Sequence, residues 1–345
     1  MKKGNPYGTH RVIDPVGVLP QPAQKISNDM EIFDNEIRVN VEFLNVDSAS
    51  FTQIKEQASG DVEKIKDIIL DIVVRRGKLK NPVTGSGGIF IGNIDKIGDK
   101  IKDIVKVKEG DKISSLVSLS LTPLRIDEII EVKKDIDQVV VRGQAILFES
   151  GIYVKLPDDM APSLAMAVLD VAGAPAQTER LVKKVDTVAI VGAAGKSGIL
   201  CAYVAKKIVG DKGRIIGIGH SDNNVKLLNE LGLCDEVVKL DATNAAACYE
   251  KIIKITDGRL CDVVINNVNI QNTEMGSILM TRDRGKVYFF SMATSFTKAA
   301  LGAEGVGKDI DMIIGNGFAH NHADTALNII RESQCIRKLY EELYI

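Results

Sequence analysis

The sequence predicts an α/β protein in which a doubly wound parallel sheet follows a mainly β, partly open barrel. Before residue 155, short alternating segments are separated by glycine-rich turns, as in a small barrel. After residue 155, β-branched segments alternate with helical patterns across short connections, which indicates a parallel sheet covered by helices. With 345 residues, the chain also exceeds one ordinary hydrophobic core. We therefore predict two domains, residues 1–155 and 156–345.

The overall composition excludes several classes of function. Hydrophobic residues make up 45% of the chain and charged residues 26%, as in globular proteins. The net charge is −2 and the basic residues are spread out, so we expect no nucleic-acid partner. The N-terminus lacks the apolar core of a signal peptide, and no apolar run is long enough to span a membrane. We expect a cytoplasmic protein without a membrane partner, whose five cysteines are reduced thiols.

In the first domain, the pattern predicts strands, one long helix and a charged hairpin. Glu36–Phe43 and the stretch around Val139–Val141 alternate apolar and polar residues, and Ile89–Ile91 leaves a glycine-rich turn. Apolar residues at helical spacing predict a helix over Asp61–Arg75. The lysine- and aspartate-rich stretch Asn93–Ile113 is interpreted as a hairpin of the barrel rather than as a repeat.

In the second domain, an entry helix at Ser163–Val171 precedes a regular alternation of strands and helices. The predicted strands are Thr187–Val191, Arg214–Ile218, Glu236–Lys239, Asp262–Ile265, Val287–Phe290 and Met312–Ile314. The predicted helices are Ser197–Val209, Asn224–Leu231, Asp324–Ile330 and Ser333–Leu343.

The segment VAIVGAAGKSG, Val188–Gly198, is the most informative motif. A β-branched strand runs into Gly192, Gly195 and Gly198, and a helix follows at once. Glycine at these positions permits a sharp turn, a close approach to a pyrophosphate and tight packing of the helix on the strand. A phosphate-binding P-loop is excluded, because Ile190 occupies the position of its first glycine. The motif predicts a Rossmann site for a nicotinamide dinucleotide.

The end of the second strand bears on the choice between NADP and NAD. Gly219 stands where NAD enzymes place an acidic residue for the ribose hydroxyls. Without that carboxylate, His220, Ser221, Asn223 or Lys226 could hold a 2′-phosphate, which favours NADP. Asp222 could still serve as the ribose acceptor, so NAD stays open. The residues predicted to contact the cofactor are Gly192, Gly195, Lys196, Ser197, Gly198, Gly219, His220, Ser221, Lys226, Asn267 and Ser291.

Most of residues 30–330 resembles the medium-chain dehydrogenase/reductase superfamily. The segments that carry this resemblance are Val41–Ile54, Asn81–Gly98, Val107–Ile113, Gly151–Met160, Arg214–Gly232, Asp262–Asn269 and Arg284–Met292. The resemblance implies a GroES-like barrel beside the Rossmann sheet. Zinc-dependent members carry a cysteine where this chain has Asp47, and a His-Glu pair where it has Ser86 and Gly87. No catalytic metal is therefore expected.

The two ends of the chain indicate a narrower resemblance. The stretches YGTHRVIDPVGVLPQPA and GNGFAHNHADTALNIIRES are similar to the diaminohexanoate dehydrogenases of lysine fermentation. The resemblance implies oxidative deamination of the 3-amino group of a diamino acid, giving 5-amino-3-oxohexanoate, ammonia and reduced NAD(P), by a homodimer. A zinc-independent enone or quinone reductase of the same superfamily is the alternative, and a cofactor-sensing protein without catalysis is a third hypothesis.

Several polar residues are candidates for the chemistry around the amine. By its place in the resemblance, Asp47 would take the amine proton or hold the ammonium group; capping of a turn is the other interpretation. Ser48 and Ser86 could relay a proton or be ordinary turn residues. Glu149 is a further acid candidate, with a solvated strand end as the alternative.

Three other groups are candidates for binding the substrate or activating water. Arg11 is predicted to bind the substrate carboxylate through its guanidinium fork, unless the N-terminal arm is a flexible tail, and Arg125 in a loop is a weaker candidate. His320 could serve the water-addition step, with helix capping in the segment around Asn321 and His322 as the alternative. Asn266 and Asn267 are expected to line the cofactor cleft.

Overall fold

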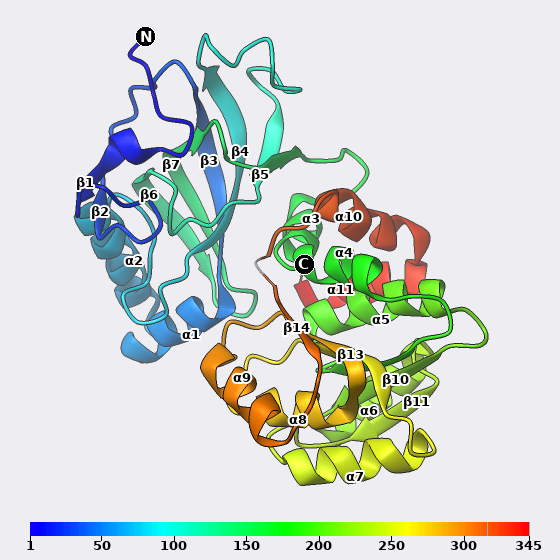
Figure 1. The fold of residues 1–345 in the computed structure, drawn as a ribbon. Helices are drawn as coiled ribbons and strands as arrows, with labels where there is room; N and C mark the ends of the chain where they lie inside the picture. The colour runs from blue at the N-terminus through cyan, green and yellow to red at the C-terminus, as the bar shows by residue number, and fades with distance from the viewer. Residues whose placement is uncertain (316, 345) are drawn as a thin grey trace. The chain divides into compact units, whose positions relative to one another are not determined.

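The computed structural model describes residues 1–315 and 317–344, and these residues form two compact units (Figure 1). Unit 1 comprises Met1–Asp170 with the last residues from Glu342, and unit 2 comprises Val171–Glu341. The contacts thus group residues 156–170 with the first unit, whereas the sequence placed them with the second. Each unit is described by itself below.

Unit 1 is built on a six-stranded antiparallel sheet with the order β6-β7-β3-β4-β5-β8. Its strands are β3 (Glu36–Val46), β4 (Gly88–Ile97), β5 (Lys112–Ser115), β6 (Leu124–Lys133), β7 (Gln138–Phe148) and β8 (Tyr153–Lys155). The N-terminal arm adds a short 3-10 turn, Thr9–Arg11, and the small pair β1 (Val12–Asp14) and β2 (Lys25–Ile26). The helices of this unit are α1 (Ser48–Gln57), α2 (Val62–Arg76) and α3 (Pro162–Leu169).

Helix α2 confirms the helix predicted from its apolar spacing. Ile65, Ile69 and Ile72 lie on one face and are buried in the core of the barrel unit. The Asp61 carboxylate accepts the backbone N–H of Lys64 at 3.1 Å and caps the first turn. The core of this unit therefore forms between the sheet and the helix, and it includes Val46, the last residue of β3 before Asp47.

Among the elements of unit 1 that the sequence did not predict, a helix and a strand bear on candidate site residues. Helix α1 follows Asp47 directly, and the serines, phenylalanine and threonine of its first half have only modest helical preference. Strand β6 contains Arg125, so the prediction of a loop around this residue was wrong. Its guanidinium bonds Asp127 and Gln144 at 3.0 and 2.9 Å on the exposed face of the sheet. Many charged residues along β6 hid the alternation that marks a strand.

Unit 2 is a parallel sheet with the order β11-β10-β9-β12-β13-β14, which confirms the predicted doubly wound fold. Its strands are β9 (Thr187–Val191), β10 (Arg214–Gly219), β11 (Glu236–Lys239), β12 (Cys261–Asn266), β13 (Thr281–Phe289) and β14 (Asp311–Ile314). Its helices are α4 (Gly173–Leu181), α5 (Lys196–Val209), α6 (Asp222–Leu231), α7 (Ala245–Ile255), α8 (Glu274–Met280), α9 (Phe296–Gly305), α10 (His322–Glu332) and α11 (Gln334–Tyr344).

The sheet of unit 2 has a hydrophobic core on each face. Val188 and Ile190 of β9 belong to one core cluster, and the alternate residues Ala189 and Val191 belong to the other. Cys201 and Cys261 are buried in these clusters, as predicted, and the cysteines form no disulfide. Burial on both faces explains why the strands are continuous apolar runs.

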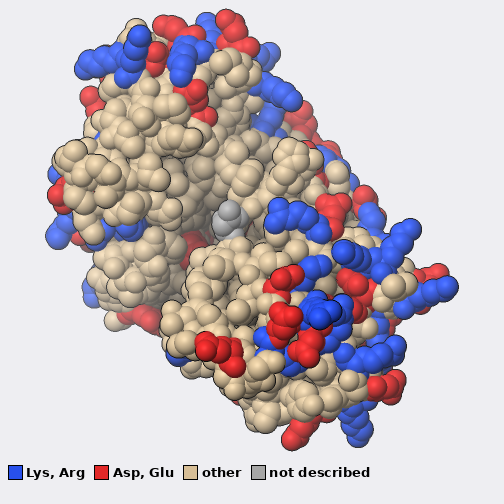
Figure 2. All heavy atoms as spheres, in the orientation of Figure 1, with Lys and Arg blue, Asp and Glu red and all other residues tan. Residues whose placement is uncertain are grey.

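The surface carries charges of both signs. On the face drawn in Figure 2, lysine and arginine side chains are interspersed with aspartate and glutamate. Among the described residues, no helix combines the length and apolar character needed to cross a membrane.

Candidate functional site

The turn between β9 and α5 has the geometry that a pyrophosphate requires. Gly192 adopts a φ of 76°, which favours glycine, and Gly195 is the N-cap of α5. A Cβ on Gly198 would lie 2.2 Å from the carbonyl oxygen of Gly192 and 2.7 Å from Cα of Ala193. The helix therefore packs on the turn as the motif predicted, with its free N–H groups at the opening.

A cavity of about 350 Å³ opens beside this turn, at the carboxyl ends of the strands of unit 2. Its lining residues are Val191, Gly192, Ala194, Gly195, Ile218, Gly219, His220, Asn224, Leu240, Asp241, Ala242, Thr243, Asn267, Val268, Asn269, Ile270 and Thr273. Asn267 is notable because its buried Nδ2 has no hydrogen-bond partner among the described residues. An unused amide donor, a glycine turn and a helix N-terminus together fit a phosphorylated dinucleotide.

The predicted cofactor residues fall into two groups. Those that line the cavity are Gly192, Gly195, Gly219, His220 and Asn267. Those that do not are Lys196, Ser197, Gly198, Ser221, Lys226 and Ser291. Gly198 has the packing role described above, and the hydroxyl of Ser221 accepts the Asn224 N–H at 3.2 Å to cap α6.

The remaining members of the second group have other environments. Ser197 is buried at the start of α5, and the carbonyl of Lys196 accepts a hydrogen bond from the Tyr340 hydroxyl. Lys226 is 76% exposed and lies 3.8 Å from Glu230. Ser291 Oγ donates to Asn269, which itself lines the cavity, at 3.4 Å.

The loop after β12 is held by Asn266, which was expected to line the cleft. Its amide instead donates to Thr273 Oγ1 at 2.9 Å and to Ser277 Oγ at 3.0 Å, while its oxygen accepts the N–H of Val268 at 3.1 Å. This buried side chain therefore shapes the loop that carries Asn267.

Sequence reasoning missed the contribution of the loop after β11. Asp241 and Thr243 line the cavity because β11 is the parallel neighbour of β10. The signal that could have found them is a polar segment, DATN, at the carboxyl end of a predicted strand.

In unit 1, Asp47 is the centre of a compact polar cluster. Its Oδ1 accepts hydrogen bonds from the backbone of Ala49 at 3.1 Å and of Ser50 at 3.4 Å, and from Ser86 Oγ at 3.1 Å. The Ser50 hydroxyl lies 2.6 Å from both Thr84 Oγ1 and Ser86 Oγ. These contacts bring Asp47 and Ser86 together and show that Asp47 caps α1.

The second carboxylate oxygen of Asp47 is the open position of this cluster. All three donors converge on Oδ1, and no described residue donates to Oδ2. The side chain is half-buried rather than exposed. Capping and a chemical role are therefore compatible, because they use different oxygens of one carboxylate.

Ser48 and Glu149 lie in other surroundings. The exposed Ser48 hydroxyl donates to Asp137 Oδ2 at 2.8 Å and so points to a partner outside the Asp47 cluster. Glu149 accepts hydrogen bonds from Lys100 at 2.7 Å and Asn35 at 2.9 Å, and these bonds lower the pKa of its carboxyl. These bonds favour the ionised carboxylate, as the alternative of a charged strand end expects, and a role of Glu149 as an acid stays a prediction.

Arg11 does not bind a substrate carboxylate, and the arm that carries it is not a flexible tail. Its guanidinium is 2% exposed and bonds both carboxylate oxygens of Glu36 at 2.6 Å. The carbonyls of Asp29 and Glu31 accept its other hydrogen bonds, at 2.6 and 2.8 Å. The side chain is thus saturated by its own chain, which corrects the prediction.

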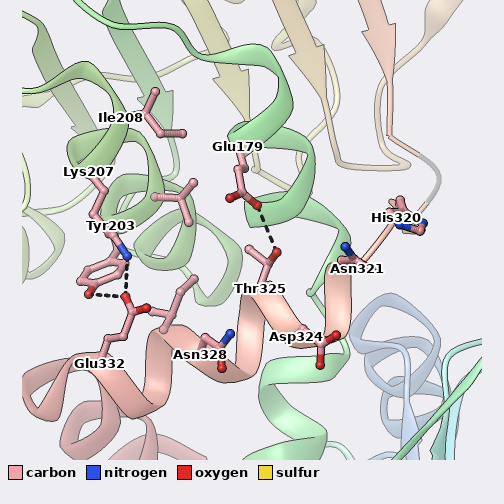
Figure 3. A pocket seen from close by; sticks show the side chains of 12 residues that line it. Glu179, Tyr203, Lys207, Ile208, His320, Asn321, Asp324, Thr325, Asn328 and Glu332 are labelled. Carbon is pink, nitrogen blue, oxygen red and sulfur yellow. Dashed lines mark hydrogen bonds and ion pairs between the residues drawn. The ribbon is translucent and has the colours of Figure 1, made fainter.

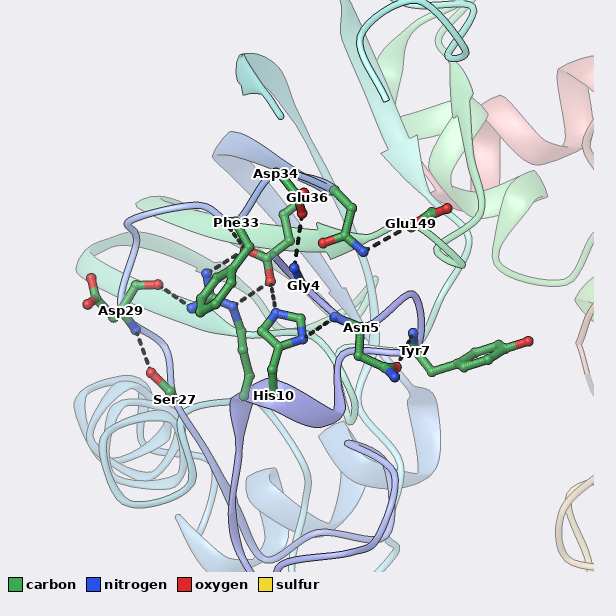
Figure 4. Close-up of polar contacts among 12 residues, drawn as sticks. Gly4, Asn5, Tyr7, His10, Ser27, Asp29, Phe33, Asp34, Glu36 and Glu149 are labelled. Atoms are coloured by element: carbon green, nitrogen blue, oxygen red, sulfur yellow. Dashed lines mark hydrogen bonds and ion pairs between the residues drawn. The ribbon is translucent and has the colours of Figure 1, made fainter. Parts of the chain in front are cut away.

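The same carboxylate anchors His10 (Figure 4). His10 Nδ1 accepts the N–H of Asn5 at 2.9 Å, so Nε2 carries the hydrogen that it shares with Glu36 Oε1 at 2.9 Å. Burial by itself raises the pKa of the Glu36 carboxyl. The hydrogen bonds from Arg11 and His10 have the larger combined effect and lower this pKa below its ordinary value. One buried carboxylate therefore holds both His10 and Arg11 of the N-terminal arm.

His320 lies at a different cavity of unit 2, of about 370 Å³, between α4, α5 and α10 (Figure 3). Glu332 there accepts hydrogen bonds from Tyr203 at 3.1 Å and Lys207 at 2.6 Å, and Thr325 donates to Glu179 at 3.1 Å. His320 does not line the cavity beside the glycine turn. Asn321 is the N-cap of α10, as the capping interpretation expects, although its side chain makes no capping hydrogen bond. The role of His320 in adding water stays a prediction.

His322 is the buried histidine of this segment. Burial lowers the pKa of its imidazole, and its ring packs edge-on against Phe318 with centroids 5.1 Å apart. Among residues 1–315 and 317–344, no group of three or more histidines, cysteines or acidic residues could hold a metal ion.

Comparison with known proteins agrees with this arrangement. Residues 10–157 match the family model described as the L-erythro-3,5-diaminohexanoate dehydrogenase N-terminal domain. Among solved structures, a mycobacterial protein complexed with NADPH has a TM-score of 0.56 at 15% identity and covers 91% of this chain and 84% of its own. An alcohol dehydrogenase from Thermus sp. ATN1 has a TM-score of 0.52 at 16% identity, with 89% and 84% covered. At these identities the similarity shows the fold alone.

Two curated relatives extend the similarity to the full chain. A protein of Acetoanaerobium sticklandii, named L-erythro-3,5-diaminohexanoate dehydrogenase, is 59% identical over 99% of this chain and 100% of its own. A protein of Fusobacterium nucleatum with the same name is 57% identical over 100% of both chains. The quinone or enone reductase alternative is not favoured by these relatives. The chain therefore belongs to the family of L-erythro-3,5-diaminohexanoate dehydrogenases.

Proposed function

We propose that this protein catalyses the NAD⁺-dependent oxidative deamination of L-erythro-3,5-diaminohexanoate at C3. The products are 5-amino-3-oxohexanoate, ammonia and the reduced dinucleotide. The observation that carries the proposal is the full-length identity of 57–59% to relatives with this name. The dinucleotide cavity of unit 2 supports it independently of the relatives.

The reaction needs an acceptor for a hydride and acceptors for protons. A dinucleotide held at the glycine turn between β9 and α5 would supply the acceptor for the hydride that leaves C3 of the substrate. The amine must lose a proton so that the C3–N bond becomes an iminium, and water then adds to C3 with loss of a second proton. Ammonia leaves as the carbonyl forms. Only the proton transfers call for groups of the protein.

Asp47 is the residue we assign to the substrate amine. Its Oδ1 is held by three donors, so the carboxylate keeps one orientation, and its Oδ2 has two lone pairs for an ammonium or an amine N–H. The Ser50, Thr84 and Ser86 hydroxyls fix the donor on the Oδ1 side. A fixed carboxylate of this kind suits an amine substrate better than a quinone.

The cavity also bears on the dinucleotide. No lysine or arginine is among its described lining residues, whereas the Asp241 carboxylate is. A 2′-phosphate carries close to two negative charges and is normally held by cationic side chains. This lining supports NAD⁺ as the preferred cofactor, in contrast to the preference for NADP drawn from Gly219 alone.

A steady-state assay with 3,5-diaminohexanoate tests the proposal. With NAD⁺, reduced dinucleotide and ammonia should form in equal amounts, and neither should form if the assignment is wrong. Asp47→Asn should lower kcat/KM by about 10²–10⁴-fold, because the base is lost while asparagine still caps α1. Asp61→Asn is the matched control, since Asp61 caps α2 in the same way. It should stay within about twofold of the wild type.

The homodimer is also part of this proposal. Strand β14 is an edge of its sheet in unit 2, and Met312 and Ile314 are 36% and 55% exposed. An open edge with apolar side chains is suited to pairing with a second copy. Light scattering of the wild type should give twice the mass of one chain, and Ile314→Lys should lower the measured mass to that of a single chain. A monomeric wild type would contradict the proposal.

A further inference from the structure

The end of β10 lacks a carboxylate for a steric reason. A Cβ on Gly219 would lie 2.8 Å from Cβ of Asn224, in the first turn of α6. Asn224 is held there by a capping box, in which its backbone N–H bonds Ser221 Oγ and its side chain accepts the Ser221 N–H at 3.3 Å. An acidic side chain at position 219 would therefore displace the start of the helix.

A carboxylate reaches the same cavity from the neighbouring strand. The backbone N–H of Leu240 donates to the carbonyl of Gly219 at 3.0 Å, which sets the end of β11 directly beside the end of β10. The next residue, Asp241, lines the cavity together with Gly219 and His220. The parallel register thus supplies the acidic group that β10 has no room for.

The contacts of Asp241 leave one oxygen available. Thr243 donates to Oδ1 twice, through its hydroxyl at 2.7 Å and its N–H at 2.9 Å, while no described residue donates to Oδ2. These hydrogen bonds, together with the nearby His220, lower the pKa of the Asp241 carboxyl, so it is ionised at neutral pH. The carboxylate is therefore oriented, charged and unused on one side.

Asp222 is closer to Gly219 in sequence but is differently placed. Its side chain is 88% exposed, pairs with Lys239 at 2.8 Å and is not part of the lining of the cavity. It therefore serves as a matched comparison for Asp241.

We propose that Asp241 is the specificity-determining residue of the dinucleotide site, accepting hydrogen bonds from the ribose hydroxyls of the adenosine half and repelling a 2′-phosphate. The inference rests on the proposed function only in that the cavity binds a nicotinamide dinucleotide. A ribose diol donates to a carboxylate, whereas a 2′-phosphate removes one donor and places negative charge against Asp241. The pocket then selects NAD(H) without an acidic residue on β10.

Direct titration of the full-length protein with NADH and NADPH, followed by calorimetry, tests this assignment without turnover. The wild type should bind NADH at least about tenfold more tightly than NADPH. Asp241→Asn should reduce that ratio about tenfold, through weaker NADH and tighter NADPH binding. Asp222→Asn should leave the ratio within about twofold of the wild type. Thr243→Val removes the hydroxyl donor to Asp241 Oδ1 and should also reduce the preference for NADH over NADPH. This variant tests the assignment if Asp241→Asn fails to fold.

Three outcomes would overturn the inference. They are a wild type without preference for NADH, an Asp241→Asn protein that binds both dinucleotides like the wild type, and an equal shift in Asp222→Asn. A wild type that binds neither dinucleotide would refute the proposed function itself. Binding with the expected ratio but no turnover of 3,5-diaminohexanoate would refute the substrate and leave the role of Asp241 supported.

Discussion

The glycine turn of unit 2 allows packing and cofactor binding to be separated by two single-methyl substitutions. In Gly198→Ala, the new Cβ would meet three backbone atoms, the carbonyl oxygen of Gly192 at 2.2 Å and the Cα and carbonyl carbon of Ala193 at 2.7 and 2.9 Å. Backbone cannot rotate away as a flexible side chain can, so β9 and α5 must separate. In Gly195→Ala, the Cβ would meet only the Gly192 oxygen, at 3.3 Å.

The magnitudes follow from this difference. Overpacking in a close-packed core costs about 1–3 kcal/mol, and the clash at Gly198 belongs at the upper end. Alanine in a helix regains up to about 1 kcal/mol relative to glycine, which leaves a net destabilisation of about 2 kcal/mol. For a domain of this size, that lowers Tm by about 4–8 °C. Gly195→Ala should change Tm by less than about 2 °C, since its backbone is extended and the contact is mild.

Gly195→Ala, which should barely change Tm, should instead weaken cofactor binding. The Cβ of Gly195→Ala lies at the helix N-terminus where a pyrophosphate approaches, so the Kd for NADH should rise about tenfold although the fold is intact. Calorimetric melting of the free proteins and titration with NADH measure the two quantities. A Gly198→Ala protein that melts with the wild type would refute the packing argument, and a Gly195→Ala protein with unchanged NADH affinity would refute the placement of the pyrophosphate.

Four further expectations concern the buried charges and metal independence. Glu36→Gln should lower the free energy of unfolding by about 3–5 kcal/mol in urea titrations, because it leaves the buried Arg11 without its charged partner. A loss below about 1 kcal/mol, the level of a surface ion pair, would contradict this. Since the pKa of Glu36 is lowered by folding from its ordinary 4.5, the stability it contributes should be complete above that pH and fall as the pH drops through the folded value, a dependence absent in Glu36→Gln. Burial lowers the pKa of Lys78 from 10.5 to about 7, so between these two pH values the unfolded chain binds more protons than the folded one. The free energy of unfolding should therefore rise with pH in this range. Lys78→Met should flatten this slope, and an unchanged slope would exclude Lys78 as its source. Dialysis against a chelator should leave turnover unchanged, and restoration of lost activity by added zinc would disprove a metal-free site.

The sequence alone determined the class of fold and the position of the dinucleotide turn. Strand β9 was predicted at its observed bounds, Thr187–Val191, and α5 to within one residue, because strand period, glycine turn and helix start are all local properties. Helix α1 and strand β6 were missed because the serine and threonine at the start of α1 and the many charged residues of β6 give weak local signals.

Only the tertiary structure decided which polar groups are available for chemistry. Arg11 looked like a free guanidinium, but Glu36, 25 residues away, occupies it. Gly219 seemed to leave the ribose without an acceptor, but the pairing of β10 with β11 brings Asp241 to the same cavity. The periodicity of a helix or strand depends on residues that are adjacent in the sequence, so it can be predicted locally. The partners of a side chain depend on strand register and packing between distant segments, which the sequence pattern does not contain.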